Sequence, residues 1–156
     1  MDVDGTLTDG KIYMGQNGEL FKAFNIKDGY GIHDILPNAG IIPIIITARE
    51  SLIVYNRCQE LGVSELYQGC RDKLKTMLDI LQKFSQTDAV EYDLHNVAYI
   101  GDDILDLRCI EIIKANGGIT ACPADAVADV KSTVDYVCSK NAGCGAVREF
   151  IEYCVQ

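Results

Sequence analysis

The stretch that decides the fold is Met1-Asp-Val-Asp-Gly-Thr-Leu-Thr-Asp-Gly10, in which two aspartates one residue apart precede a glycine. Side chains alternate along a strand, so Asp2 and Asp4 can face the same side where a strand ends. Gly5 allows the backbone to turn tightly at that point. Two carboxylates this close repel each other unless a cation or a shared proton offsets their charge. The stretch therefore indicates a metal-assisted site in which one carboxylate attacks and the other transfers a proton.

Short apolar segments alternate with amphipathic segments along the rest of the chain. Strands are predicted at residues 42–47, 66–68, 97–100, 118–121 and 135–138. Helices are predicted at residues 30–37, 51–61, 72–84, 104–115 and 146–154. Ser51 and Gly62 are typical of the start and the end of the second helix, and the acidic segment 85–96 is predicted to be a surface loop. The alternation predicts an α/β fold, a Rossmann-like parallel sheet with helices on both faces, in one domain over residues 1–156.

Polar side chains follow three of the predicted strands. Thr47 ends an apolar strand, Lys73 begins a helix, and Asp102 and Asp103 end a further strand with Asp106 one helical turn later. Taken singly, each has a structural explanation as a helix cap or a solvated charge. Ligands of open α/β sheets bind at the carboxyl ends of the strands. We therefore expect these side chains to form one site with the two N-terminal aspartates.

The composition excludes several classes of protein. A net charge of −9 argues against a nucleic-acid partner, because phosphate backbones require a basic surface. The longest apolar run, Ile41–Ile46, is too short to span a membrane, and no signal peptide is expected because Asp2 and Asp4 interrupt the first apolar residues. Seven cysteines without a CxxC pair indicate free thiols in a cytoplasmic protein.

The order of these motifs resembles the four-motif signature of haloacid dehalogenase superfamily phosphatases: DxDGT at Asp2, then Thr47, Lys73 and GDDxxD from Gly101 to Asp106. The segments DVDGTLTDGKIY, FNIKDGYGI, IITAR, ELGVSELYQGCRDKL, VAYIGDD and GAVREF resemble more closely the capless family of 3-deoxy-D-manno-octulosonate 8-phosphate phosphatases. The resemblance covers residues 2–150. It implies a Mg²⁺-dependent phosphoric monoester hydrolase of lipopolysaccharide biosynthesis that acts on a small anionic sugar-acid phosphate.

The resemblance also implies roles for the motif residues. Asp2 is the expected nucleophile, which forms an aspartyl-phosphate intermediate. Asp4 is expected to protonate the departing sugar oxygen and then to deprotonate the attacking water. Mg²⁺ is expected to bind Asp2, the backbone carbonyl of Asp4 and Asp102. Thr47 and Lys73 are expected to bind the transferred phosphoryl group.

Further residues are expected to support these groups or to contact the sugar. Asp103 and Asp106 are expected to orient Lys73 and metal-bound waters. A glycine-rich tail at residues 143–148 is expected to close over a site. By resemblance, the sugar-acid contacts are Asn25, Ile26, Lys27, Asp28, Gly29, His33, Arg49, Arg57, Lys73 and Arg148. Either Arg49 or Arg57 is suited to bind a carboxylate through a bidentate fork.

No cap domain fits between the motifs. About forty residues separate Asp4 from Thr47, and about twenty-five separate Thr47 from Lys73. Gly15-Gln-Asn-Gly18 predicts a hairpin over residues 11–24, and a two-stranded hairpin is marginal in water by itself. Its apolar residues are Ile12, Met14, Leu20, Phe21 and Phe24. We expect the hairpin to mediate oligomerisation, and the resemblance implies a homotetramer in which hairpins help to cover neighbouring active sites.

Two alternatives to this substrate and activity stay open. Ala121-Cys-Pro-Ala-Asp125 also resembles phosphatases of nonulosonic acid metabolism, which favours a nonulosonate 9-phosphate as an alternative substrate. A non-catalytic oligomerisation domain, related to those fused to cytidylyltransferases, is the other alternative, although the intact acidic motifs argue against it. A nucleophile at a strand end normally follows four or five apolar residues, so we also expect residues upstream of Met1 in the active protein.

Overall fold

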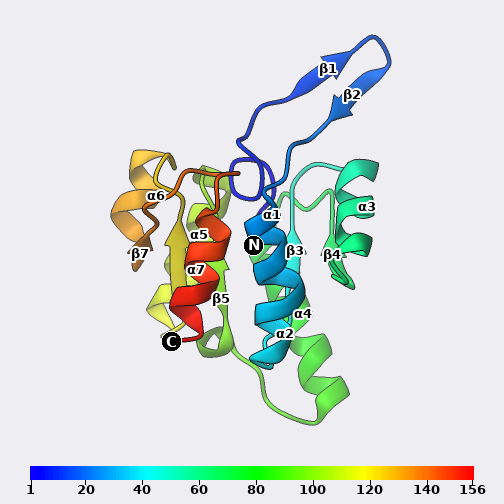
Figure 1. Ribbon diagram of the computed structural model, residues 1–156. Helices are drawn as coiled ribbons and strands as arrows, with labels where there is room; N and C mark the ends of the chain where they lie inside the picture. The colour runs from blue at the N-terminus through cyan, green and yellow to red at the C-terminus, as the bar shows by residue number, and fades with distance from the viewer.

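Five short parallel strands form the centre of the computed structural model, which describes residues 1–156 (Figure 1). The strands are β3 (Ile44–Ile46), β4 (Glu65–Tyr67), β5 (Ala98–Ile100), β6 (Ile119–Cys122) and β7 (Tyr136–Val137). β3 pairs with β4, β5 pairs with β6, and β6 pairs with β7, each in parallel. All five predicted strands are confirmed, with ends that differ by no more than two residues.

The N-terminal stretch lies between the two sets of strands. The Met1 amino group donates a hydrogen bond to the Ile44 carbonyl (2.9 Å), and the Ile46 amide donates to the Met1 carbonyl (3.1 Å). On the other side, the Asp2 amide donates to the Ile100 carbonyl (3.1 Å). Met1 and Asp2 therefore join β3 to β5, and the chain leaves the sheet at its carboxyl edge with Asp2 at the centre.

Helices cover both faces of the sheet, as predicted. They are α1 (Ile26–Tyr30), the π-helix η1 (Gly31–Ile35), α2 (Leu36–Asn38), α3 (Leu52–Glu60), α4 (Lys73–Asp88), the 3₁₀-helix η2 (Leu94–Asn96), α5 (Ile104–Ala115), α6 (Ala128–Thr133) and α7 (Ala146–Cys154). One apolar cluster joins the sheet to η1, α2, α3 and α7, and a second joins it to α4, α5 and α6. None of the helices combines the length and the apolar character needed to cross a membrane.

The prediction of a surface loop over residues 85–96 is wrong in part. Helix α4 continues to Asp88, because no glycine or proline interrupts it and Phe84 packs against the apolar core. The Ser85 hydroxyl donates to the Leu81 carbonyl (2.8 Å), and the Tyr92 amide donates to the Ser85 hydroxyl (2.9 Å). Residues 85–88 are therefore helical, and the connection between α4 and η2 is confined to residues 89–93. The helix predicted at 30–37 begins earlier, at Ile26, and α6 was not predicted.

The predicted hairpin is confirmed and projects from the body of the molecule (Figure 1). Strand β1 (Tyr13–Gly15) pairs with β2 (Gly18–Phe21) in antiparallel register. The rings of Tyr13 and Phe21 stack with their centroids 4.3 Å apart. Ile12, Met14, Leu20 and Phe21 are each about half exposed or more. The hairpin thus presents an apolar surface that this chain does not cover.

Candidate active site

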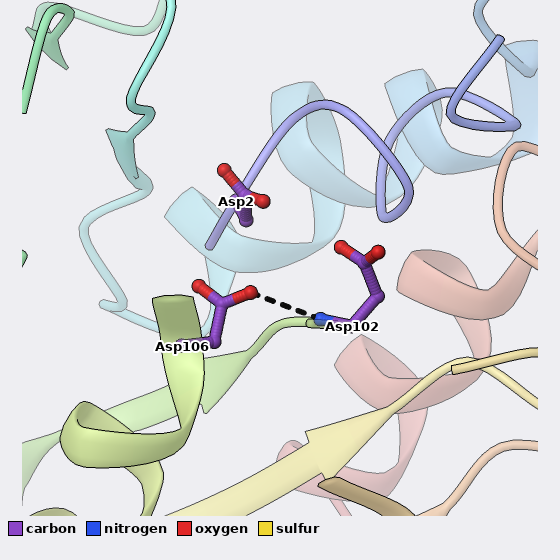
Figure 2. Close-up of side chains that lie close together, drawn as sticks. All are labelled: Asp2, Asp102 and Asp106. Atoms are coloured by element: carbon purple, nitrogen blue, oxygen red, sulfur yellow. Dashed lines mark hydrogen bonds between the residues drawn. The ribbon is translucent and has the colours of Figure 1, made fainter. Parts of the chain in front are cut away.

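Three aspartates from different elements surround one space at the carboxyl edge of the sheet (Figure 2). Asp2 comes from the N-terminal stretch, Asp102 follows β5, and Asp106 lies in the first turn of α5. One carboxylate oxygen from each lies within 4.8 Å of the others. The prediction that strand ends bring distant acids together is confirmed for this group.

Lys73, the first residue of α4, lies between two of these acids. Its Nζ is 2.9 Å from Asp2 Oδ1 and 2.7 Å from Asp106 Oδ1, and its side chain is only 1% exposed. We call Asp2, Lys73, Asp102 and Asp106 the inner cluster. Asp72 caps α4 by accepting a hydrogen bond from the Lys75 amide (3.1 Å), which fixes where the helix begins and so where Lys73 enters the cluster.

Asp106 is fully engaged by hydrogen-bond donors. Its Oδ1 accepts from Lys73 and from the Tyr99 hydroxyl (2.5 Å), and its Oδ2 accepts from the amides of Asp102 (3.1 Å) and Asp103 (3.3 Å). Asp106 therefore orients Lys73 rather than offering a free oxygen to a ligand. Asp103 instead caps α5, because its side chain accepts from the Ile104 amide (2.7 Å) and not from Lys73.

The inner cluster carries an excess of negative charge, with three carboxylates facing one ammonium. Burial and the charge of Asp106, partly offset by Lys73, raise the pKa of Asp2 to about 6. Burial, together with the charges of Asp2 and Asp106, raises the pKa of Asp102 to about 7. Burial is the larger cause of both raised pKa values and repulsion between the carboxylates comes second, and both effects disfavour the ionised forms. A cation bound among the three carboxylates would offset both effects.

The available oxygens fit a hard divalent cation such as Mg²⁺. Asp102 Oδ1 accepts a hydrogen bond from the Thr6 hydroxyl (3.0 Å), which leaves Oδ2 without a partner in the protein. A side chain at Gly5 would clash with that oxygen, so only glycine fits beside it. The Asp4 carbonyl accepts no backbone hydrogen bond. Asp2, Asp102 and the Asp4 carbonyl are thus the groups that could hold the ion.

A second group of charges surrounds the Asp4 side chain. The ammonium of Lys22, just after β2, contacts Asp4 Oδ1 and lies 2.9 Å from Glu19 Oε1. Arg49 donates from Nη2 to Glu19 Oε1 (3.1 Å), and its Nε is 3.8 Å from Asp4 Oδ2. We call Asp4, Glu19, Lys22 and Arg49 the rim cluster. Two carboxylates and two cations make it neutral.

Thr47 stands at the end of β3, next to the N-terminal stretch that pairs with Ile46. Its amide donates to the Tyr67 carbonyl (2.9 Å), and its carbonyl accepts from the Cys70 amide (3.0 Å). These bonds hold the residue at the carboxyl edge, where it is only 2% exposed, and its hydroxyl makes no hydrogen bond within the protein. Thr47 therefore offers a free hydroxyl close to the inner cluster.

Several of the expected sugar contacts lie around a narrow pocket between α1 and α3. Asn25, Asp28, Gly29 and Arg57 line it together with apolar side chains. The Arg57 guanidinium contacts Glu60 (2.7 Å) and lies over the Phe24 ring, 5.7 Å from its centroid. Its Nε and Asp28 Oδ2 are buried without hydrogen-bond partners. The pocket is polar only at these few points.

Asp28 contacts the C-terminal helix. Its Oδ1 accepts a hydrogen bond from the Arg148 amide (2.7 Å), while burial raises the pKa of Asp28. The Gly143 amide donates to the Thr6 carbonyl (3.2 Å), so the glycine-rich tail is fixed against the loop that follows Asp2. The Arg148 side chain binds Glu152 (2.7 Å) and lies over the Tyr30 ring.

Three expected sugar contacts have no partner in the site. Ile26 is 82% exposed, Lys27 is exposed, and the exposed His33 contacts only Asp34 (3.1 Å). Conversely, sequence reasoning missed Glu19 and Lys22. A Glu-x-x-Lys pair on a hairpin is typical of a solvated surface, so nothing local signalled that these side chains turn back to the acids.

Comparisons with known proteins identify relatives over nearly the whole chain, although no family model matches it. The chain is 44% identical over 149 residues to the 3-deoxy-D-manno-octulosonate 8-phosphate phosphatase KdsC of Escherichia coli K12, a match that covers 96% of this chain and 73% of that protein. It is 39% identical over 148 residues to the KdsC of Yersinia pestis, with coverage of 95% and 73%.

Solved structures give the same result. The 3-deoxy-D-manno-octulosonate 8-phosphate phosphatase of Moraxella catarrhalis, in complex with a magnesium ion, a phosphate ion and a KDO molecule, has a TM-score of 0.84 and 37% identity, covering 98% of this chain and 82% of that one. The cobalt-bound enzyme of Haemophilus influenzae has a TM-score of 0.84 and 36% identity, covering 97% and 82%. These matches confirm the resemblance found in the motifs. The chain therefore belongs to the family of 3-deoxy-D-manno-octulosonate 8-phosphate phosphatases, haloacid dehalogenase-type enzymes that hydrolyse phosphoric monoesters.

Proposed function

We propose that this chain is a Mg²⁺-dependent phosphatase whose substrate is 3-deoxy-D-manno-octulosonate 8-phosphate. The observation that carries the proposal is the inner cluster: three carboxylates from separate elements around one buried ammonium, at the sheet edge where such folds bind ligands. The Moraxella catarrhalis relative binds magnesium, phosphate and KDO. Magnesium suits the inner cluster, because the groups that could bind an ion there are oxygens and their excess negative charge favours a cation.

The proposed reaction passes through an aspartyl phosphate. The Asp2 carboxylate attacks the phosphorus atom, and the bond from phosphorus to the sugar oxygen breaks. Asp4 gives its proton to the departing oxygen and then takes a proton from the water that hydrolyses the intermediate. Lys73 and the free hydroxyl of Thr47 hold the phosphoryl oxygens, where negative charge accumulates.

Asp2, Asp102 and the Asp4 carbonyl would hold Mg²⁺ in this proposal. The ion supplies positive charge that offsets the inner cluster and the phosphoryl oxygens. Asp106 keeps Lys73 directed at Asp2 through their 2.7 Å contact. Among the expected sugar contacts, Arg49 is retained beside Asp4, and Asn25 and Arg57 border the adjacent pocket.

We also propose that the chain forms a homotetramer through the hairpin. Among its exposed apolar residues, Met14 and Leu20 are more than 60% accessible, and such surfaces are stabilised by burial against a partner. Replacing Leu20 with Glu should produce monomers in sedimentation velocity. The matched control Leu78→Glu, on the similarly exposed surface of α4, should leave the assembly intact. A wild-type monomer with full activity would contradict the proposal.

The thiols support a cytoplasmic location. All seven cysteines are free, and Cys58, Cys109, Cys122 and Cys138 are buried. Free thiols persist in reducing compartments. Cell fractionation should recover the activity with cytoplasmic markers, and recovery with a secreted or membrane fraction would contradict this location.

A substrate panel tests the proposed function directly. Phosphate release from octulosonate 8-phosphate should exceed that from nonulosonate 9-phosphates and hexose phosphates in kcat/KM, and chelation of Mg²⁺ should abolish it. A preference for a nonulosonate 9-phosphate would assign the alternative substrate. An absence of turnover with every sugar phosphate would favour a non-catalytic oligomerisation domain.

A further inference from the structure

The Glu19 carboxylate is bound by three donors at the rim of the site. Lys22 Nζ and Arg49 Nη2 lie 2.9 Å and 3.1 Å from its Oε1, and the Ser51 hydroxyl donates to its Oε2 (2.7 Å). Burial acts to raise the pKa of Glu19, but hydrogen bonds from Ser51 and Lys22 outweigh it and hold the pKa below its usual value. The rim therefore contains a binding site for an ionised carboxylate, and Glu19 fills it.

This carboxylate site is assembled from two segments of the chain, the hairpin of β1 and β2 and the loop between β3 and α3. Lys22 follows β2, Arg49 follows β3, and Ser51 precedes α3, where its hydroxyl makes no capping bond to the helix. The Lys22 side chain is only 1% exposed, although it belongs to a projecting hairpin. Two cations and a hydroxyl from these two segments converge on one carboxylate. Such convergence is typical of a binding site and not of a scattered surface pair.

The position of the site relates it to the leaving group. Lys22 and Arg49 both contact the side chain of Asp4, which acts on the sugar oxygen in the proposed mechanism. Groups around Asp4 therefore face the sugar and not the phosphoryl group, which belongs to the inner cluster. A sugar acid differs from a neutral sugar in carrying a carboxylate, the same group that Glu19 presents to the rim.

We propose that Glu19 is an internal substitute for the substrate carboxylate, and that Lys22 and Glu19 determine the preference for sugar acids. This inference rests on the proposed function. A sugar acid that displaces Glu19 replaces one carboxylate by another, so the charge and hydrogen bonds of Lys22 and Arg49 are preserved. A neutral sugar that displaces Glu19 leaves Lys22 and Arg49 with Asp4 as their one remaining carboxylate, an excess of positive charge that penalises the neutral sugar. The preference for sugar acids thus arises both from binding of their carboxylate and from the penalty on neutral sugars.

Kinetics with a matched pair of substrates test this exchange. The pair is octulosonate 8-phosphate and its analogue in which the carboxylate is reduced to an alcohol. A substitution that disturbs Asp4 or the fold should lower kcat/KM for both substrates equally and leave their ratio unchanged. Glu19→Gln removes the competing charge and should raise kcat/KM for the acid about tenfold, while the value for the alcohol changes by less than about twofold. Lys22→Met should lower the acid-to-alcohol ratio by about tenfold or more. Glu111→Gln, an exposed residue of α5, removes the same charge elsewhere and should leave the ratio unchanged.

The outcomes separate this inference from the proposed function. A higher acid-to-alcohol ratio in Glu19→Gln and a lower one in Lys22→Met support the exchange. An unchanged acid-to-alcohol ratio in Glu19→Gln, or a loss of kcat/KM for the acid in that variant, overturns the exchange. The proposed function still stands in that case if the wild type shows Mg²⁺-dependent turnover. A wild type that hydrolyses neither substrate overturns both.

Discussion

The inner and rim clusters contain the same types of residue but differ in charge balance. The inner cluster has three carboxylates for one cation, and the pKa values of Asp2 and Asp102 are raised to about 6 and about 7. The rim cluster has two carboxylates for two cations, and the pKa of Glu19 is lowered. A buried excess of like charge requires an outside partner, whereas a balanced group does not. The inner cluster should therefore bind an additional cation, Mg²⁺. The rim cluster should instead exchange one carboxylate, that of Glu19, for the carboxylate of the substrate.

The nucleophile gives the largest expected effect in the inner cluster. Asp2→Asn keeps the shape of the side chain but removes the attacking oxygen, so kcat should fall by at least about 10⁴-fold. Phosphate release in a stopped assay measures it. Asp9→Asn, in the same loop and paired only with Lys11, is the matched control and should retain activity. Substantial turnover by Asp2→Asn would refute the aspartyl-phosphate mechanism.

Asp4 belongs to the rim cluster, and the effect of replacing it on kcat should depend on the leaving group of the substrate. Asp4→Asn removes the proton donor, so kcat for the sugar phosphate should fall about 10²- to 10⁴-fold. A nitrophenyl phosphate leaves without needing a proton, so its hydrolysis should fall much less. Equal losses for the two substrates would argue that Asp4 acts through the fold or the metal and not as an acid.

Lys73 is the single cation of the inner cluster, and its removal should destabilise the protein. Lys73→Met leaves the buried carboxylates of Asp2 and Asp106 uncompensated, so the free energy of unfolding at neutral pH should fall by about 3 kcal/mol. Urea unfolding measures the change. Lys75, whose side chain is 71% exposed, is the matched control, and Lys75→Met should cost less than about 0.5 kcal/mol. A similar small cost for Lys73→Met would show that the inner cluster does not depend on its ammonium.

The fold was largely predictable because local patterns determine it. Strands ending in Thr47 and Asp102 alternate with amphipathic helices, and this order admits few arrangements other than a parallel sheet. The extension of α4 is not evident from the sequence, because residues 85–88 are polar and polar composition is typical of loops as well as of exposed helix. The contact of Phe84 with the core, which sustains the last turns, depends on tertiary structure.

The inner cluster was also predictable, since carboxyl ends of parallel strands meet at one edge. The rim cluster was only half predicted, through Asp4 and Arg49. Glu19 and Lys22 lie on a hairpin whose direction relative to the sheet has no signal in periodicity. Asp28, which lines the adjacent pocket, also accepts a hydrogen bond from the Arg148 amide, a pairing across 120 residues that no local pattern encodes.

The pH dependence of Mg²⁺ affinity tests the excess negative charge of the inner cluster. Asp2 and Asp102 titrate near pH 6 and pH 7 in the metal-free protein, so both must lose protons before they can hold the ion. Affinity for Mg²⁺ should therefore rise by roughly tenfold per pH unit or more between about pH 5.5 and pH 7, and level off above. Titration calorimetry in buffers of different ionisation enthalpy measures both the affinity and the protons released.

The same pKa values fix the sign of the stability change. Because the folded protein holds these protons more tightly than the unfolded chain, its metal-free stability should decrease as pH rises from about 4 through about 7. Mg²⁺ should restore stability chiefly above pH 7, so the gain in Tm on adding it should be larger near pH 8 than near pH 5.5. Asp102→Asn should abolish most of that gain, whereas Glu19→Gln in the balanced rim cluster should preserve it. A Tm gain independent of pH would mean that the two carboxylates are already ionised without the metal, and that the inner cluster has no unmet need for a cation.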